Sequence, residues 1–164
     1  MSRTNNLRKL VKSMLSAAKF KADHGIKEIY YELADDDKMY PHIVFSFDNI
    51  NTGDLYRHDL SLMIDIYDKS DSAFLVEEIA DDVEDMFNAA NLPQDSILPT
   101  FYLEARRQVI DEDKKIRHRQ IEVIVQNYEM LEEVNMDGLQ DINSAELYDV
   151  LSRKLATKEV VLND

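Results

Sequence analysis

The spacing of apolar residues near the start of the chain predicts a helix over about residues 5–20. Six apolar residues follow one another at spacings of three and four, which places them on one helix face: Leu7, Leu10, Val11, Met14, Leu15 and Ala18. Gly25 comes after a short polar stretch and is a typical residue for ending a helical region. We therefore expect the first helical region to end before Gly25.

Apolar and polar residues alternate in five later segments, and this period of two predicts strands. The clearest alternation places Leu60, Leu62, Ile64 and Ile66 on one face of a strand. Asn51 and Asp54 belong to a hairpin loop that also holds Gly53, and the polar run Asp111-Glu112-Asp113-Lys114-Lys115 is typical of a hairpin tip. We predict strands over residues 26–33, 42–48, 55–67, 100–110 and 116–128.

A second amphipathic helix is predicted over residues 72–88. Its apolar stripe consists of Phe74, Leu75, Ile79, Val83, Met86 and Phe87. Its other side is strongly acidic and is interpreted as a solvated outer face: Glu77, Glu78, Asp81, Asp82, Glu84 and Asp85.

The order of these elements predicts an α+β fold. The economical arrangement is a mainly antiparallel β-sheet with the helices packed on one face. We assign this domain to residues 1–128. Residues 129–164 form an acidic C-terminal extension, in which a short helix is expected from Ser144 onward.

Charge is unevenly distributed along the chain, and it argues against a general role in nucleic-acid binding. The formal net charge of the 164 residues is −14, and such an excess repels phosphates. Residues 1–27 nevertheless hold seven Lys or Arg and one Asp, whereas residues 128–164 hold three basic and nine acidic residues. A basic head and an acidic body can therefore attract one another between copies of the chain.

Membrane insertion and secretion are not expected. No stretch approaches the roughly 20 continuous apolar residues that span a bilayer, and residues 1–12 lack the apolar core of a secretion signal. We therefore expect the chain to stay in the cytoplasm in which it is made.

Candidate chemistry is sparse, so we expect no catalytic residues, no metal and no cofactor. Cysteine is absent, and the three glycines are too few and too scattered for a phosphate-cradling loop. The consecutive residues Asp35, Asp36 and Asp37 lack the alternating pattern of a calcium loop. His42 and His58 fall on predicted strands and are interpreted as residues of the sheet surface or of a subunit contact.

Two apolar strands and the helix that follows them carry a resemblance to a known family. The segments that carry it are, in order, Tyr40-Pro41-His42-Ile43-Val44-Phe45, Arg57 to Asp68, and the helix from Ser72 to Phe87. With the hairpin around residues 111–115, this order resembles the tail-terminator, or tail-completion and head–tail joining, proteins of long-tailed bacteriophages. The resemblance covers about residues 5–128, and the extension beyond it is longer than the usual ending of the family.

The resemblance implies a structural protein of the virion, located at the tail and neck and assembled in the host cytoplasm. Such a protein forms a ring, generally of six subunits, that caps the tail tube, stops its polymerisation and meets the head connector. DNA only passes through the lumen. The family implies no catalytic residues. The candidate contacts with other subunits or with the tube are Asn51, Asp54, Asp111, Glu112, Asp113, Lys114 and Lys115.

Two other classes of function fit the same sequence. One is another neck, head-completion or tail-assembly protein of a phage. The other is a small non-viral α+β domain that binds a ligand. Self-association separates the virion proteins from a monomeric binding domain.

Overall fold

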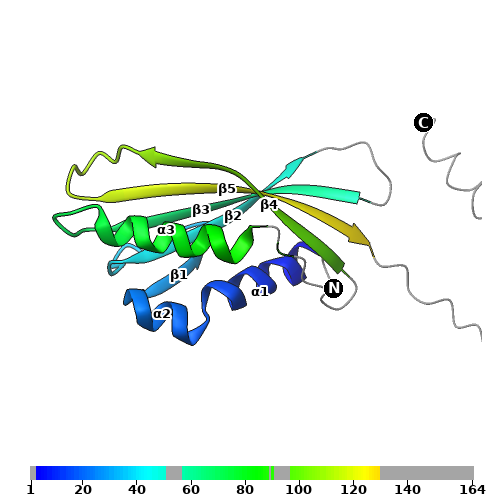
Figure 1. The fold of residues 1–164 in the computed structure, drawn as a ribbon, viewed down its shortest axis with the longest axis horizontal. Helices are drawn as coiled ribbons and strands as arrows, with labels where there is room; N and C mark the ends of the chain where they lie inside the picture. Colours follow the sequence, from blue (N-terminus) through cyan, green and yellow to red (C-terminus); the bar gives the residue numbers. More distant parts are fainter. Residues whose placement is uncertain (1–2, 51–56, 89, 91–96, 130–164) are drawn as a thin grey trace, which may run out of the picture. The chain divides into compact units, whose positions relative to one another are not determined.

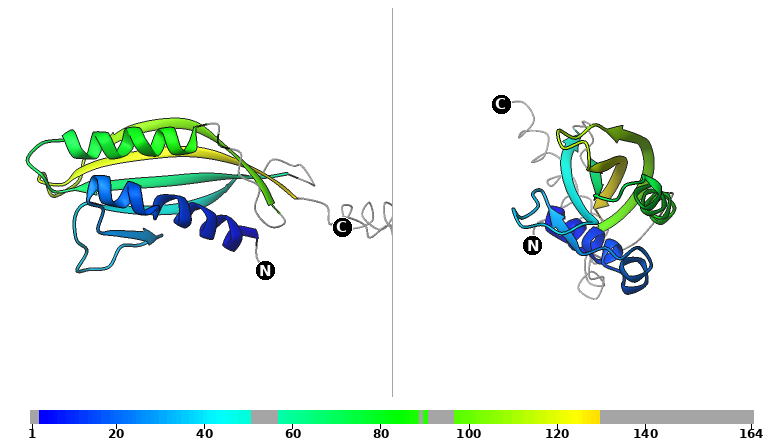
Figure 2. Two further views of the ribbon diagram at one scale, coloured as in Figure 1. Left: turned by 60° about the horizontal axis from the view of Figure 1, so that its bottom comes forward. Right: turned by 90° about the vertical axis from the view of Figure 1, so that its left-hand side faces the viewer.

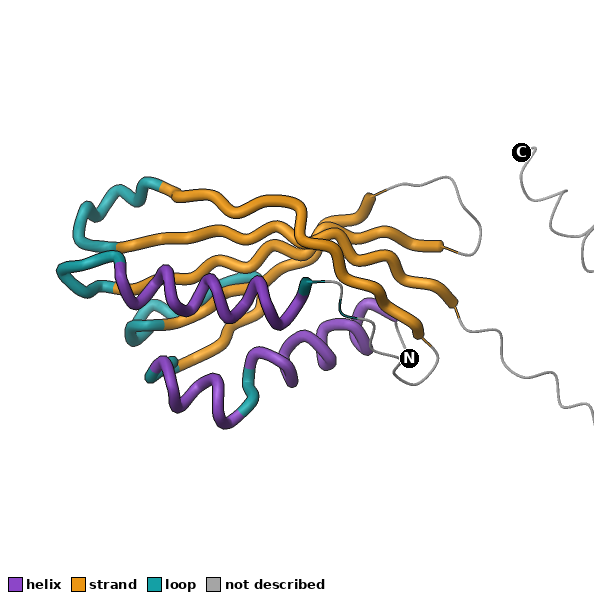
Figure 3. Tube along the Cα trace, viewed as in Figure 1, coloured by secondary structure: helices purple, strands orange, loops and turns teal. Residues whose placement is uncertain are grey.

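A computed structural model of the protein describes residues 3–50, 57–88, 90 and 97–129. Within these ranges the chain forms three helices and five strands, which confirms the predicted α+β class (Figure 3). In chain order they are α1 (Arg3–Leu15), α2 (Ala18–His24), β1 (Glu28–Tyr31), β2 (His42–Ile50), β3 (Arg57–Asp68), α3 (Phe74–Phe87), β4 (Ile97–Val109) and β5 (Arg117–Glu129).

The five strands form one sheet in the order β1-β2-β3-β5-β4 (Figure 1). Three of the four pairings are antiparallel, so the expected mainly antiparallel sheet is confirmed. The exception is β1, which pairs with β2 in parallel. Two parallel strands need a connection that runs back to the end at which the first strand begins. Residues 32–41 form this connection.

One face of the sheet supplies the core together with the helices. Ile64 of β3 lies between Phe45 of β2 and Ile121 of β5 in the register, and all three side chains are fully buried. Leu7 of α1 and Ile79 of α3 belong to the same hydrophobic cluster. Both helices therefore pack on one face, as predicted, and the views in Figure 2 show them running along the sheet.

The helix predicted over residues 5–20 is two helices. α1 ends at Leu15, Ala17 has an extended backbone, and α2 begins at Ala18. In one straight helix Phe20 would lie about 140° around the axis from the buried Leu15. The break brings Phe20 into the core, while Ala18, which the spacing placed on the buried stripe, is exposed. α2 does end at Gly25, as expected, in the left-handed conformation with φ 63°.

The apolar stripe of α3 is displaced from the predicted one. Phe74 is 71% exposed, whereas Val76 and Ala80 are buried. The buried set is Val76, Ile79, Ala80, Val83 and Phe87. This stripe has regular helical spacing, and including Phe74 was wrong because Phe74 lies about 200° around the helix axis from the buried Val76 of the same turn.

Two predictions lie largely outside the described residues. The loop that contains Asn51 and Asp54 falls in residues 51–56, and the extension 129–164 is described only at Glu129. Both remain predictions.

Candidate assembly surface

The β4–β5 hairpin tip, residues 110–116, is held in shape by its own side chains. Asp111 Oδ1 accepts a hydrogen bond from the N–H of Asp113 at 3.1 Å, and Asp113 Oδ1 accepts one from the N–H of Lys115 at 3.0 Å. Lys69, which follows β3, reaches Asp113 Oδ2 at 3.0 Å. The backbone N–H of Lys115 and the ammonium of Lys69 both lower the pKa of Asp113. The predicted contact residues Asp111 to Lys115 therefore form a structured, solvent-facing tip.

A shallow pocket of about 270 Å³ lies beside this tip. Its walls combine apolar and basic side chains from the hairpin, the start of β5 and the residue before α3. The lining residues are Ala73, Gln108, Val109, Ile110, Asp111, Lys114, Ile116, Arg117, His118 and Arg119. Of the residues predicted as contacts, Asp111 and Lys114 line the pocket. Whether they touch another subunit stays a prediction.

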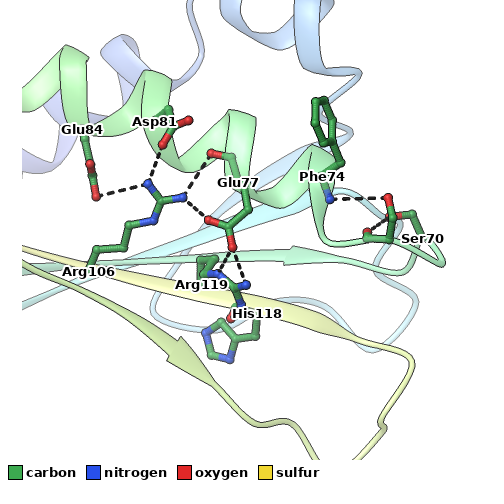
Figure 4. Close-up of polar contacts among 9 residues, drawn as sticks. Ser70, Phe74, Glu77, Asp81, Glu84, Arg106, His118 and Arg119 are labelled. Atoms are coloured by element: carbon green, nitrogen blue, oxygen red, sulfur yellow. Dashed lines mark hydrogen bonds and ion pairs between the residues drawn. The ribbon is translucent and has the colours of Figure 1, made fainter.

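The acidic side of α3 is bound to the sheet by two arginines, as Figure 4 shows. Arg119 of β5 donates from Nε to Glu77 Oε1 at 2.6 Å. Arg106 of β4 binds Glu77 as well, and donates from Nη1 to Asp81 Oδ1 at 2.5 Å. Glu84 Oε1 lies 3.6 Å from the same Arg106 nitrogen.

This arginine clamp corrects the prediction of a solvated acidic face on α3 for Glu77 and Glu84 alone, because Glu78, Asp81, Asp82 and Asp85 are exposed, as predicted. Glu77 and Glu84 are only partly exposed, and their carboxylates face cations on the sheet. Asp82 is tied to His24 of α2, with His24 Nε2 2.7 Å from Asp82 Oδ2. The hydrogen bond from Arg119 lowers the pKa of Glu77, with a further contribution from Arg106. The acidic side of α3 thus both holds the helix to the sheet and presents exposed carboxylates.

The face of the sheet opposite the helices carries a column of stacked rings. Tyr67 of β3 stacks on His42 of β2 at 4.9 Å and on His118 of β5 at 4.1 Å between ring centroids. Tyr30 of β1 meets His42 edge-on at 5.8 Å. His118 Nε2 lies 2.7 Å from Asp65 Oδ1. We refer to Tyr30, His42, Tyr67 and His118 as the ring column.

The ring column corrects the interpretation of His42 as a surface residue, because His42 is 1% exposed. Its Nδ1 is 3.0 Å from the carbonyl oxygen of Met39, which leaves Nε2 within the column. Burial is the largest cause that lowers the pKa of His42. Burial also raises the pKa of Tyr67 to about 12. The sequence places the residues of the ring column on strands, but only the register of four strands brings them together.

A basic surface lies along α1. Arg8, Lys9 and Lys12, together with Asn5, line a second hollow of about 420 Å³. The Arg8 guanidinium lies over the ring of Tyr31, 4.2 Å from its centroid. Part of the positive head expected from the composition is thus a basic stripe on α1.

No metal centre is evident in the described part of the chain, where no group of three or more His, Cys, Asp or Glu is arranged to hold an ion. Of the helices in the same ranges, none has the length and apolar character that crossing a membrane requires.

Comparison with known proteins finds a likeness in structure alone. No model of a known protein family matches this chain, and no curated protein matches its sequence. A chain in a solved structure described as "Virion of native gene transfer agent (GTA) particle" superposes with a TM-score of 0.61. The two chains share a fold. The match covers 72% of this chain and 91% of the other, at 14% sequence identity.

Proposed function

We propose that this chain is a structural protein of a phage-like virion. In this proposal it assembles as a ring on the end of the tail tube, stops tube polymerisation and joins the tail to the head connector. The observation that carries the proposal is the fold shared with a chain of a gene transfer agent virion. The order of strands and helices, which resembles tail-terminator proteins, supports the same role.

The charge of the molecule is compatible with this role. A ring through which DNA passes must not retain phosphates, and a net charge of −14 opposes such retention. A group of basic residues lies on α1, where Arg8, Lys9 and Lys12 lie together. One acidic and one basic surface give a capping ring two unlike sides, one for the tube and one for the connector. We propose no catalytic activity.

The experiment that tests the role is deletion of the gene in an infected or induced cell. We expect DNA-filled heads without joined tails, together with tails of uncontrolled length, in electron micrographs of the lysate. Supplying the intact gene in trans restores joined particles. Normal virions from the deletion strain would contradict the proposal.

A second candidate, another neck or tail-assembly protein, is favoured by the same structural likeness, because the match is to a chain of a virion without a stated role. Purified tail-tube protein separates the two. A terminator binds the tube end and stops elongation in a light-scattering assay. A neck protein that acts elsewhere leaves the elongation curve unchanged.

A further inference from the structure

The pocket beside the hairpin tip has features of a binding site for an acidic, partly apolar segment. Ile110 lines it and is 89% exposed, and Ile116 contributes a second apolar side chain. Lys114 forms no ion pair or side-chain hydrogen bond with another described residue. Arg117 donates through Nη2 to the carbonyl oxygen of Asp71 at 3.2 Å, but its Nε is buried without an acceptor. The positive charge of this partly exposed, pocket-lining side chain attracts a carboxylate that enters the pocket.

A segment of matching chemistry lies between β1 and β2. Leu33 is 81% exposed and Met39 is 57% exposed, and three aspartates stand between them in sequence. None of the carboxylates of Asp35, Asp36 and Asp37 forms an ion pair or a hydrogen bond with another described side chain. We call residues 33–39 the acidic loop. Large apolar side chains next to unpaired carboxylates complement a pocket that has isoleucines and unpaired cationic groups.

The pocket and the acidic loop lie on opposite edges of the sheet. The strand order β1-β2-β3-β5-β4 places the loop beside β1 at one edge and the hairpin tip beyond β4 at the other. Figure 1 shows the β4–β5 connection and the β1–β2 connection toward the same end of the strands. Among the described residues of one subunit, no ion pair or hydrogen bond joins the acidic loop to the pocket lining, whereas a copy placed edge to edge brings the two surfaces together.

From this complementarity we infer that the acidic loop of one subunit docks in the hairpin pocket of the next. This contact rests on the proposed ring assembly and specifies the surfaces that build it. It is a contact between two different surfaces, and such contacts generate closed rings when the rotation between copies closes. A two-fold contact of loop with loop would place six aspartates together, which like-charge repulsion disfavours.

In the docked arrangement, the aspartates of the acidic loop face the positive charges of Lys114 and Arg117. Leu33 and Met39 cover Ile110 and Ile116. Asp111 also lines the pocket, and its negative charge disfavours the entry of many carboxylates. A contact of this size is weak when it is made once, so closure of the whole ring supplies its stability.

The absence of cysteine from the natural chain makes disulfide trapping a direct test. Asp36→Cys and Lys114→Cys are prepared as separate full-length proteins, mixed at high concentration and oxidised. We expect disulfide-linked dimers between the two variants, because a disulfide forms only where two Cα atoms approach to about 4–7 Å. The chain that carries both substitutions should give a ladder of covalent oligomers that ends at the ring size.

Matched controls define the outcomes that overturn the inference. Asp85→Cys on the exposed side of α3, mixed with Lys114→Cys, should give no linked dimer. If Asp85→Cys links as efficiently as Asp36→Cys, or if linked dimers form only within one variant, the contact is wrong. Efficient linking of Lys114→Cys to Asp141→Cys would instead assign the pocket to the acidic C-terminal segment and would also overturn it.

Charge reversal gives a readout without covalent chemistry. We expect Lys114→Glu to weaken self-association about tenfold in sedimentation experiments, and the added substitution Asp36→Lys to restore most of it. Unchanged association in Lys114→Glu would contradict the docking. If the deletion strain gives unjoined tails but no specific cross-link forms, the proposed virion role is supported and the proposed contact is wrong. If the specific cross-link forms but the deletion strain gives normal virions, the contact is supported and the proposed virion role is wrong.

Discussion

The two faces of the sheet are buried in different ways. The covered face is aliphatic: Ile64, Leu62 and Val123 are fully buried beneath α1 and α3. None of the described helices lies over the opposite face, yet this face buries His42 almost completely within the ring column. The covered face is stabilised by removal of methyl and methylene groups from water, and the ring column by stacking and one hydrogen-bonded carboxylate.

This difference shows that alternation of apolar and polar residues identifies only one of the two packed faces of the sheet. Alternation identifies the covered face, because that face needs only apolar side chains. The opposite face is polar by composition, but cross-strand pairing of rings makes part of it a second, smaller packed region. The four predictions below test this comparison, from the largest expected effect to the smallest.

Truncation on the covered face should have the largest effect. We expect Ile79→Ala to lower the free energy of unfolding by ~2–5 kcal/mol, because it removes buried methylenes and leaves a cavity against the sheet. Chemical denaturation measures this difference. Phe74→Ala on the same helix is the control and should change stability by less than about 0.5 kcal/mol, since Phe74 is 71% exposed. Equal losses in the two variants would mean that the stripe of α3 is misplaced.

Removal of the central ring of the opposite face should have a smaller effect. We expect Tyr67→Ala to cost ~1–3 kcal/mol, because two ring contacts are lost and each contributes about 0.5–1.5 kcal/mol. Tyr67→Phe keeps both stacked contacts and should lose much less. A loss in Tyr67→Ala that matches Tyr67→Phe would show that the column is a surface feature.

The ring column should also make the free energy of unfolding depend on pH in the acidic range. Burial lowers the pKa of His42 below its ordinary value of 6.5, so on acidification the unfolded chain takes up this proton before the folded chain does. Stability from this group is therefore complete above about pH 6.5 and falls as pH drops toward the lower folded pKa. His42→Asn, which can still donate to the carbonyl of Met39, should show a shallower loss between pH 6.5 and 5. Parallel pH profiles would argue against a buried His42.

The smallest effect should come from the exposed end of the arginine clamp. Asp81 is 67% exposed, and exposed ion pairs contribute about 0–1 kcal/mol. We expect Asp81→Asn to lower the free energy of unfolding by at most about 0.5 kcal/mol, and less at high salt. Asp85→Asn, at an exposed position of the same helix, is the control in the same denaturation assay. A loss above 1 kcal/mol that salt does not reduce would contradict a solvent-screened pair.

Local patterns were sufficient for the strands and for most of the helices. The alternation of Leu60, Leu62, Ile64 and Ile66 identifies β3 and its buried face, because neighbouring residues of a strand always point to opposite sides. The break after Leu15 was missed, since no proline or glycine marks it. It follows from where Phe20 must pack, which is a tertiary constraint.

The candidate site was predictable only in part. The sequence indicates the hairpin tip at Asp111 to Lys115, because a polar run between two alternating segments is a local signal. The pocket beside the tip, the arginine clamp and the ring column depend on residues from several elements. Glu77 and Arg119 are 42 positions apart, and no period in the chain relates them. Their pairing requires the strand order and the position of α3.

The place of β5 in the sheet has a consequence for the synthesis of the protein. β5 is the last described strand in the sequence, but it lies between β3 and β4 and pairs with both. Until the ribosome has passed Glu129, β3 has an unpaired edge and β4 has no neighbouring strand on which to form. A nonsense codon before Arg117 therefore yields an aggregation-prone fragment, and the domain can complete its fold only after β5 has been synthesised.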